Sequence, residues 1–261
     1  MSAALPLEAF SDADLERRFG GLRRLYGDAG YERLRAAKVA VVGVGGVGSW
    51  AAEALARSGV AGLTLIDLDH VAESNINRQV QALETTLGQA KVQALRERIA
   101  LIHPGCVVDT VEAFVEPDVW PGLLSQPVDA LIDACDQMRA KTVLADWARS
   151  RQVAFVSVGA AGGKRRAQDV EVQDIADVTH DPLLASLRQR LRQRHGVPRK
   201  GAIGLRCVFS REPVRRPDGA CDVEGSLNCK GYGSAVSVTA VFGLVAAGEV
   251  IEQLLSGRAE A

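Results

Sequence analysis

A short apolar run at residues 39–42 leads directly into a glycine-rich turn, and this junction constrains the fold more than any other feature of the chain. The run is typical of a buried parallel strand, and the turn is typical of a connection from such a strand to a helix. Its glycines allow the main chain to approach a phosphate group, which then binds N–H groups at the start of that helix. They are Gly43, Gly45, Gly46 and Gly48. The junction therefore predicts a nucleotide-binding site, and sites of this kind bind NAD, FAD or ATP.

Side chains beyond the second predicted strand favour ATP among these nucleotides. Asp67, at the end of that strand, has the position of an acid that holds a ribose hydroxyl. The polar and charged residues that follow it include Asp69, Ser74, Asn75, Arg78, Gln79 and Lys91. An enzyme that neutralises a triphosphate needs such cations, because Arg binds phosphate oxygens through a fork and Lys supplies a point charge. A dinucleotide-dependent oxidoreductase, the competing interpretation, has no evident use for Arg78 and Lys91 beside its nucleotide.

Strand and helix patterns alternate along the chain, which predicts an α/β fold with a Rossmann-like, doubly wound and mostly parallel sheet. Strands are predicted at residues 38–42, 63–67, 107–111, 128–134, 153–158, 170–173 and 205–210, and helices at 15–34, 48–57, about 92–102 and 141–150. We interpret the chain as an N-terminal tail, 1–14, and a single domain, 15–261. Within that domain we expect a nucleotide-binding core at about 36–160, a substrate-facing insertion at about 161–232 and a closing helix at about 234–255.

Positive charge is concentrated in residues 164–216, although the formal net charge of the whole chain is only -1. This segment holds 13 Lys or Arg residues against 6 Asp or Glu residues, whereas the remainder holds 18 against 26. Such segregation is a common footprint of nucleic-acid binding, and it predicts a polyanion partner for Arg188, Arg192, Arg199 and Lys200. A solvated helix face is the alternative interpretation.

Cysteine spacing and apolar segments bear on metal binding and on the compartment. The five cysteines are scattered and never spaced as C-x-x-C, which argues against a disulfide framework and against zinc knuckles. The acidic N-terminus has no long apolar run, so we expect a cytoplasmic protein without a secretory signal. Residues 235–248 are almost wholly apolar but shorter than the roughly 20 residues of a membrane helix. A buried core helix is therefore expected there, with membrane association as the alternative.

Several of these motifs in combination resemble the ThiF/MoeB, ubiquitin-activating-enzyme-like adenylating family, over about residues 17–160. They are the glycine turn at 43–48, Asp67-Leu68-Asp69, Ser74-Asn75, Asn77-Arg78-Gln79, residues 88–91 and residues 133–136. Further segments resemble the branch of this family formed by tRNA threonylcarbamoyladenosine dehydratases, and they extend the resemblance to nearly the whole chain. They are residues 18–21, 24–27, 159–163, 180–183 and 207–210.

The resemblance implies an ATP site in which Asp67 holds the ribose, and Asn75, Arg78 and Lys91 hold the phosphates. It places Mg²⁺ on Asp136, which suits a hard cation that takes one or two carboxylates besides phosphate oxygens. Helix capping by Asp136 and a surface ion pair of Arg78 are the structural alternatives.

The same resemblance implies a two-fold homodimer, in which an arginine near the N-terminus of one subunit reaches the ATP of the other. Arg24 and Arg18 are both candidates for this role, and a surface charge without a dimer is the alternative. Cys229 precedes the last predicted helix, whose N-terminus would lower the pKa of a thiol and make it reactive. A small buried hydrophobe is the other interpretation of this cysteine.

The implied reaction begins with adenylation of the carboxylate of N6-threonylcarbamoyladenosine in tRNA. The carbamoyl group of the same modification then closes a ring, with loss of AMP and net loss of one water. An adenylyltransferase that activates the C-terminal glycine of a ubiquitin-like sulfur-carrier protein is the alternative, and such enzymes commonly have the zinc knuckles that this sequence lacks. The sequence leaves open which tRNAs bind, whether Na⁺ or K⁺ assists, and whether a cysteine desulfurase or a sulfur acceptor docks.

Overall fold

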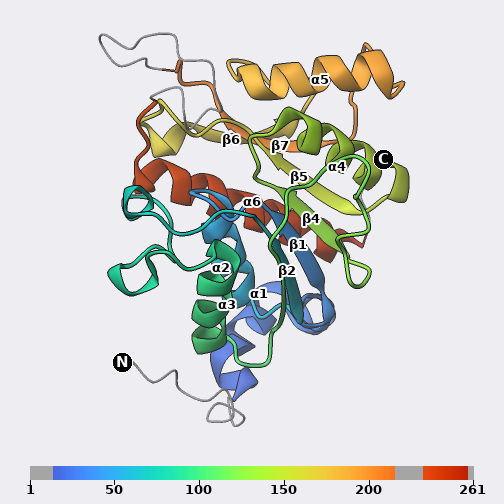
Figure 1. Ribbon diagram of the computed structural model, residues 1–261. Coiled ribbons are helices and arrows are strands. Elements are labelled where there is room, and N and C mark those ends of the chain that lie inside the picture. Colours follow the sequence, from blue (N-terminus) through green and yellow to red (C-terminus); the bar gives the residue numbers. More distant parts are fainter. Residues whose placement is uncertain (1–13, 215–231, 258–261) are drawn as a thin grey trace.

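A computed structural model of the protein, which describes residues 14–214 and 232–257, has a seven-stranded sheet at its centre (Figure 1). The strands are β1 (Lys38–Val42), β2 (Gly62–Ile66), β3 (Val107–Val111), β4 (Ala130–Asp133), β5 (Ala154–Val158), β6 (Val170–Asp174) and β7 (Arg206–Ser210). They lie in the order β3-β2-β1-β4-β5-β7-β6, and every neighbouring pair is parallel except β6 and β7. The predicted α/β fold with a mostly parallel sheet is confirmed.

Helices cover both faces of the sheet (Figure 1). They are α1 (Leu15–Ala36), α2 (Gly48–Arg57), α3 (Lys91–Ile102), α4 (Met138–Arg151), α5 (Pro182–Arg194) and α6 (Val236–Ser256). Val39 and Val41 belong to the apolar cluster formed with α1, α2, α3 and α6, whereas Ala40 and Val42 belong to the cluster formed with α4 and α5. Alternate residues of β1 thus face opposite layers, which is why a central parallel strand is apolar at every position.

Every predicted strand and helix is present, and the differences from the predicted bounds lie at element ends. β1, α2 and β3 begin and end where the sequence predicts. β2 ends one residue early, at Ile66: the N–H of Asp67 still donates to the main-chain oxygen of Val111, but its carboxylate accepts the N–H of Val44 in the glycine turn at 2.8 Å. The segment expected as an insertion contributes two strands to the same sheet, since β7 pairs in parallel with β5 and β6 pairs antiparallel with β7.

The order of the strands creates a crevice beside the glycine turn. From β1 the chain moves outward through β2 to β3, and it then returns to the other side of β1 to form β4 and β5. Open α/β sheets bind their ligands at this switch point, beyond the carboxyl ends of the strands. The turn that follows β1 therefore lies where the topology itself predicts a site.

The apolar C-terminal segment forms α6, the one described helix that is long and apolar enough to cross a membrane. Its most apolar window has a mean hydropathy of 1.6, and 56% of that window is buried inside the protein. Val238, Phe242 and Val250 on this helix pack into the apolar cluster on one face of the sheet. This packing agrees with the core helix that the sequence predicts.

His103 ends α3 inside a small cluster that the sequence does not single out. Its side chain is fully buried and packs against the ring of Phe19 at a centroid distance of 4.7 Å. Its Nε2 lies 2.9 Å from Nη1 of Arg35, and since a guanidinium only donates, Nε2 is the acceptor and the ring is neutral. Burial, followed by the charges of Arg35 and Arg18, lowers the pKa of His103 to about 4.

Acidification is expected to destabilise the protein through His103. The unfolded chain takes up a proton on His103 below about pH 6.5, whereas the folded protein does so only near pH 4. The free energy of unfolding is therefore highest above pH 6.5 and falls as the pH falls between these two values. Between pH 7.5 and pH 5 the free energy of unfolding should fall by about 2 kcal/mol from this group alone. Urea titrations should show that His103→Gln loses about 2 kcal/mol less than the wild type over this interval. Equal losses would contradict this account.

Candidate active site

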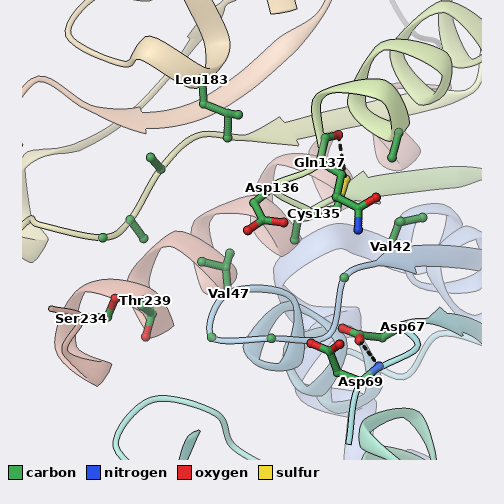
Figure 2. A pocket seen from close by; sticks show the side chains of 18 of the residues that line it. Val42, Val47, Asp67, Asp69, Cys135, Asp136, Gln137, Leu183, Ser234 and Thr239 are labelled. Atoms are coloured by element: carbon green, nitrogen blue, oxygen red, sulfur yellow. Dashed lines mark hydrogen bonds between the residues drawn. The ribbon is translucent and has the colours of Figure 1, made fainter. Parts of the chain in front are cut away.

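A cavity of about 540 Å³ opens beyond the carboxyl ends of β1, β2 and β4 (Figure 2). Val42 and Ile66, the last residues of β1 and β2, form part of its lining together with the glycine turn. Gly43 has a φ of 82°, a conformation that favours glycine, and a Cβ there would lie 2.9 Å from the main chain of Ala134. The turn can fold against the end of β4 only because this position has no side chain.

Asp67 is held against the glycine turn. Its Oδ2 accepts the N–H of Val44 at 2.8 Å, and its Oδ1 accepts the N–H of Asp69 at 2.9 Å. Burial raises the pKa of this carboxyl, although the charge of Lys91 and the two N–H groups act in the opposite direction. Asp67 also lines the cavity, so an oriented acceptor is available there to a hydroxyl group such as that of a ribose.

Arg78 and Lys91, the two predicted phosphate ligands with positive charge, both line this cavity. The Nζ of Lys91 lies 2.6 Å from Oδ2 of Asp69, and the Lys91 side chain is only 8% exposed. Nη1 of Arg78 donates to the main-chain oxygen of Ser74 at 2.7 Å and to Oδ1 of Asn77 at 2.9 Å. No ion pair of Arg78 occurs within residues 14–214 and 232–257, so the alternative of a surface ion pair finds no support. A desolvated ammonium and an oriented guanidinium in one cavity suit a polyphosphate ligand.

Asp136 lies in the loop between β4 and α4 and lines the cavity (Figure 2). The N-cap of α4 is Gln137 and makes no side-chain capping bond, so Asp136 does not act as the cap of this helix. The described part of the chain contains no group of three or more His, Cys, Asp or Glu residues that could hold a metal ion. A metal at Asp136 would therefore depend on oxygens of the ligand, which is the usual situation of Mg²⁺ at a nucleotide.

A buried ion pair underlies this loop. Nζ of Lys141 lies 2.9 Å from Oδ2 of Asp133, and both side chains are fully buried. The same carboxylate accepts the hydroxyl of Ser157 at 2.7 Å and the thiol of Cys135 at 3.0 Å. Burial alone would lower the pKa of Lys141, but the carboxylate of Asp133 raises it above its usual value. Burial also raises the pKa of Cys135, so this thiol stays protonated.

The other predicted nucleotide ligands divide into two groups. Those that line the cavity are Gly45, Gly46, Asp69 and Gln79. Those outside its lining are Gly48, Ser74 and Asn75. Asn75 is buried, and its Oδ1 accepts the N–H of Ala72 at 3.0 Å. In this structure the side-chain oxygen of Asn75 therefore shapes the loop that carries Arg78, and the role of Asn75 as a phosphate ligand stays a prediction.

The two N-terminal arginines lie on α1, and neither lines the cavity of its own subunit. Nη1 of Arg18 donates to the main-chain oxygen of Ile102 at 2.6 Å, so this guanidinium already has an acceptor. Arg24 is exposed and makes no hydrogen bond or ion pair with any described residue. Arg24 is thus the freer of the two candidates. Cys229 lies outside the described residues.

The end of the cavity away from Asp67 is bounded by segments for which the sequence predicts no chemical role. We call this boundary the distal wall, and it consists of residues 159–162, Pro182, Leu183, Val214, Tyr232 and Ser234. Figure 2 shows Leu183 and Asp67 at opposite ends of the cavity, with Asp136 between them. Sequence reasoning finds these segments only as parts of a family resemblance, because nothing in their local pattern indicates that they meet.

Part of the positive charge in residues 164–216 makes internal contacts. Lys164 is buried and donates to two main-chain oxygens, at 3.0 and 2.7 Å. Arg188 likewise donates to two main-chain oxygens, at 2.8 and 2.7 Å, and Arg192 approaches a third at 3.4 Å. Arg199 and Lys200 are exposed and form no hydrogen bond or ion pair within the part of the chain that the structure describes. The guanidinium of Arg188 therefore holds loop carbonyls, whereas no described residue competes for the side chains of Arg199 and Lys200.

The fold and the site define an α/β nucleotide-binding protein, with a cation-lined cavity at the switch point of its sheet. The chain belongs to the ThiF family, whose model matches residues 18–261. The family resemblance seen in the sequence is therefore confirmed.

Relatives within this family are similar over most of the chain. The tRNA threonylcarbamoyladenosine dehydratase of Escherichia coli (strain K12) is 41% identical, over 92% of this chain and 94% of its own. The Haemophilus influenzae protein of the same name is 38% identical over the same shares. Molybdopterin-synthase adenylyltransferase of Salmonella typhimurium is 36% identical, but over only 51% of this chain and 52% of its own. The crystal structure of the E. coli dehydratase in complex with ATP matches with a TM-score of 0.85 at 40% identity, covering 95% of this chain and 97% of that one.

Proposed function

We propose that the protein is an ATP-dependent dehydratase that acts on N6-threonylcarbamoyladenosine in tRNA. The observation that carries this proposal is the similarity to dehydratases of that name along nearly their whole length. The site agrees with it, because one cavity combines the glycine turn, the acid Asp67 and the cations Arg78 and Lys91. Similarity to molybdopterin-synthase adenylyltransferases covers only 51% of the chain, so the adenylyltransferase alternative receives less support.

The first step is adenylation of the substrate. The carboxylate of the threonyl group attacks the α-phosphorus of ATP, and pyrophosphate leaves with the electron pair of the broken P–O bond. Asp67 orients the ribose, the N–H groups of the glycine turn bind phosphate oxygens, and Arg78 and Lys91 stabilise the charge that develops on the pyrophosphate. Because these groups are held in place before the substrate binds, they stabilise the transition state without reorganisation.

The second step closes the ring. The carbamoyl group attacks the acyl carbonyl carbon, AMP leaves with the electron pair and the oxygen of the former carboxylate, and the attacking group gives up a proton to water. The modified nucleoside is then lighter by one water. Since the nucleophile and the acyl group belong to one molecule, their effective concentration is high and the protein has mainly to position them.

Asp136 is the residue that would hold Mg²⁺, which neutralises phosphate charge when it is bound with ATP. The carboxylate lies between the glycine turn and the distal wall, where the phosphates of ATP would come closest to the second substrate (Figure 2). Titrating Mg²⁺, and then Na⁺ or K⁺, into the assay described next would show which cations the reaction needs.

Mass spectrometry of digested tRNA tests the reaction. Purified protein, ATP, Mg²⁺ and tRNA bearing N6-threonylcarbamoyladenosine should give a nucleoside lighter by one water, with AMP released in equal amount. The same tRNA without this modification serves as the control and should release no AMP. AMP that forms only with a glycine-ended carrier protein, without a dehydrated nucleoside, would favour the adenylyltransferase alternative. Cys229→Ser in this assay separates direct attack on the acyl-adenylate from a thioester route, which would require the thiol.

Arg24 gives rise to a prediction about a homodimer. If Arg24 of one subunit completes the site of the other, Arg24→Ala and Lys91→Ala should each be inactive alone, whereas a random mixture should recover about one quarter of wild-type activity. Half of the dimers in such a mixture are heterodimers, and each has one intact site. Recovery only when Arg18→Ala replaces Arg24→Ala would assign the role to Arg18, and recovery in neither mixture would exclude a shared site.

Arg199 and Lys200 give rise to a prediction about tRNA. Neutralising both to Gln should weaken tRNA binding and reduce the slope of log affinity against log salt concentration by about 1 to 2, because each phosphate contact releases counterions. Arg17→Gln with Arg96→Gln removes the same charge from exposed positions on α1 and α3 and should leave the slope unchanged. Equal slopes for the two double variants would mean that Arg199 and Lys200 belong to a solvated surface and do not contact tRNA.

A further inference from the structure

The two ends of the cavity differ in their chemistry. Asp67, Asp69, Arg78 and Lys91 give the nucleotide end four charged side chains. The residues of the distal wall are all uncharged, and they include the ring of Tyr232 and the apolar side chains of Pro182 and Leu183. A triphosphate gains little from such a surface. A flat and neutral ring system fits it, because apolar and aromatic side chains bind the faces of such rings.

Hydrogen bonds connect the segments of the distal wall to one another. Oδ2 of Asp181, which is only 2% exposed, accepts the N–H of Ala160 at 2.8 Å, and its other carboxylate oxygen caps α5. The N–H of Gly163 donates to the main-chain oxygen of Gly233 at 2.9 Å. Only glycine fits at position 159, because a Cβ on Gly159 would overlap Oδ2 of Asp181. The loop after β5, the start of α5 and the segment before α6 therefore form one preorganised surface.

α5 connects this surface to the exposed cations. The helix starts at Pro182, in the distal wall, and its 13 residues end at Arg194. At 1.5 Å per residue it is about 20 Å long, which a few nucleotides of a single strand can span. Arg199 and Lys200 follow its C-terminal end and are exposed. Figure 1 shows α5 at the outer edge of the molecule, and its outward side chains are exposed at Pro182, Ser186, Gln189 and Gln193.

We infer that the distal wall binds the modified adenine base, splayed out of a tRNA loop, while Arg199 and Lys200 contact phosphates of the same strand. The inference rests on the proposed function and names the place of its second substrate. RNA loops are commonly recognised in this way, with an unstacked base held on side chains and its backbone held by cations. With the base on the distal wall and ATP at the glycine turn, the threonyl carboxylate lies between them, beside Asp136.

Two matched substitutions on α5 test this inference. Leu183→Glu puts a carboxylate in the distal wall, whereas Ser186→Glu makes the same charge change at an exposed position outside the cavity. Leu183→Glu should lower kcat/KM for the modified tRNA at least tenfold, because the new charge is desolvated by the base and repels the substrate carboxylate. ATP affinity, measured by calorimetry, should stay within twofold, and Ser186→Glu should change neither quantity by more than twofold. Tyr232→Ala, which removes the aromatic face, should cost roughly tenfold in kcat/KM for tRNA.

The wild-type protein separates failure of the inference from failure of the proposed function. If the wild-type protein does not dehydrate the modified tRNA, the proposed function itself is wrong. A working wild type with equal kcat/KM in Leu183→Glu and Ser186→Glu would show that the base binds elsewhere. If Leu183→Glu or Tyr232→Ala weakened ATP binding as strongly as tRNA turnover, the distal wall would belong to the ATP site, and the inference would also be wrong.

Discussion

Lys91→Ala is expected to lower the rate of AMP formation by at least about 100-fold, the usual effect of removing a preorganised charge from a transition state. The Lys91 side chain is only 8% exposed, and its Nζ lies 2.6 Å from Oδ2 of Asp69, so water cannot replace its charge cheaply. The substitution also leaves the carboxylate of Asp69 without its cation, and this carboxylate then repels the incoming triphosphate. Both effects reduce the stability of the transition state more than that of the free enzyme.

Pyrophosphate release with modified tRNA measures the effect, and circular dichroism verifies that the fold is intact. Lys38→Ala is the matched control, because Lys38 lies at the amino end of β1 and the cavity lies beyond its carboxyl end. This variant should keep full activity. Lys91→Ala combined with Asp69→Asn should recover part of the ATP affinity, since the repelling carboxylate is gone. Turnover of Lys91→Ala within threefold of the wild type would show that this lysine is not a phosphate ligand.

The nucleotide end of the cavity could be predicted from the sequence because local patterns determine it. The φ of Gly43 and the contact of Asp67 with the N–H of Val44 both arise where one strand meets one turn. The carboxyl ends of neighbouring parallel strands then meet at one edge of the sheet, so Asp67 and Asp136 had to come together once the fold was known. Here a motif and a topology rule are enough.

The distal wall could not be predicted in this way, because it depends on contacts between segments far apart in the chain. The carboxylate of Asp181 holds Ala160, and β7 adds to the sheet beside β5. Neither contact leaves a periodic signal in the sequence. Arg188 shows the opposite error: its charge indicates a surface, but loop carbonyls within reach turn it into an internal donor.

The buried ion pair of Lys141 and Asp133 is another feature that could not be predicted from the residue types alone. The sequence predicts only that a helix begins at Lys141, and lysine is rarely buried. α4 instead begins at Met138 and packs on the sheet, and its second turn brings Lys141 over the end of β4. The available signal was the spacing of an acid that ends a buried strand and a lysine in the helix that follows.

Lys141→Met is expected to lower the free energy of unfolding by about 3 to 5 kcal/mol, because it leaves the carboxylate of Asp133 buried without a cation. Adding Asp133→Asn should restore most of this loss, since the amide oxygen can still accept the hydroxyl of Ser157 and no charge remains unpaired. Asp133→Asn alone should also be destabilising, because it leaves the ammonium of Lys141 unpaired. Urea unfolding of the three variants measures the coupling of the pair directly. A loss below about 1 kcal/mol in Lys141→Met would mean that the carboxylate is protonated or hydrated in this variant. A double variant as unstable as Lys141→Met would mean that packing around Lys141, and not charge, holds α4 on the sheet.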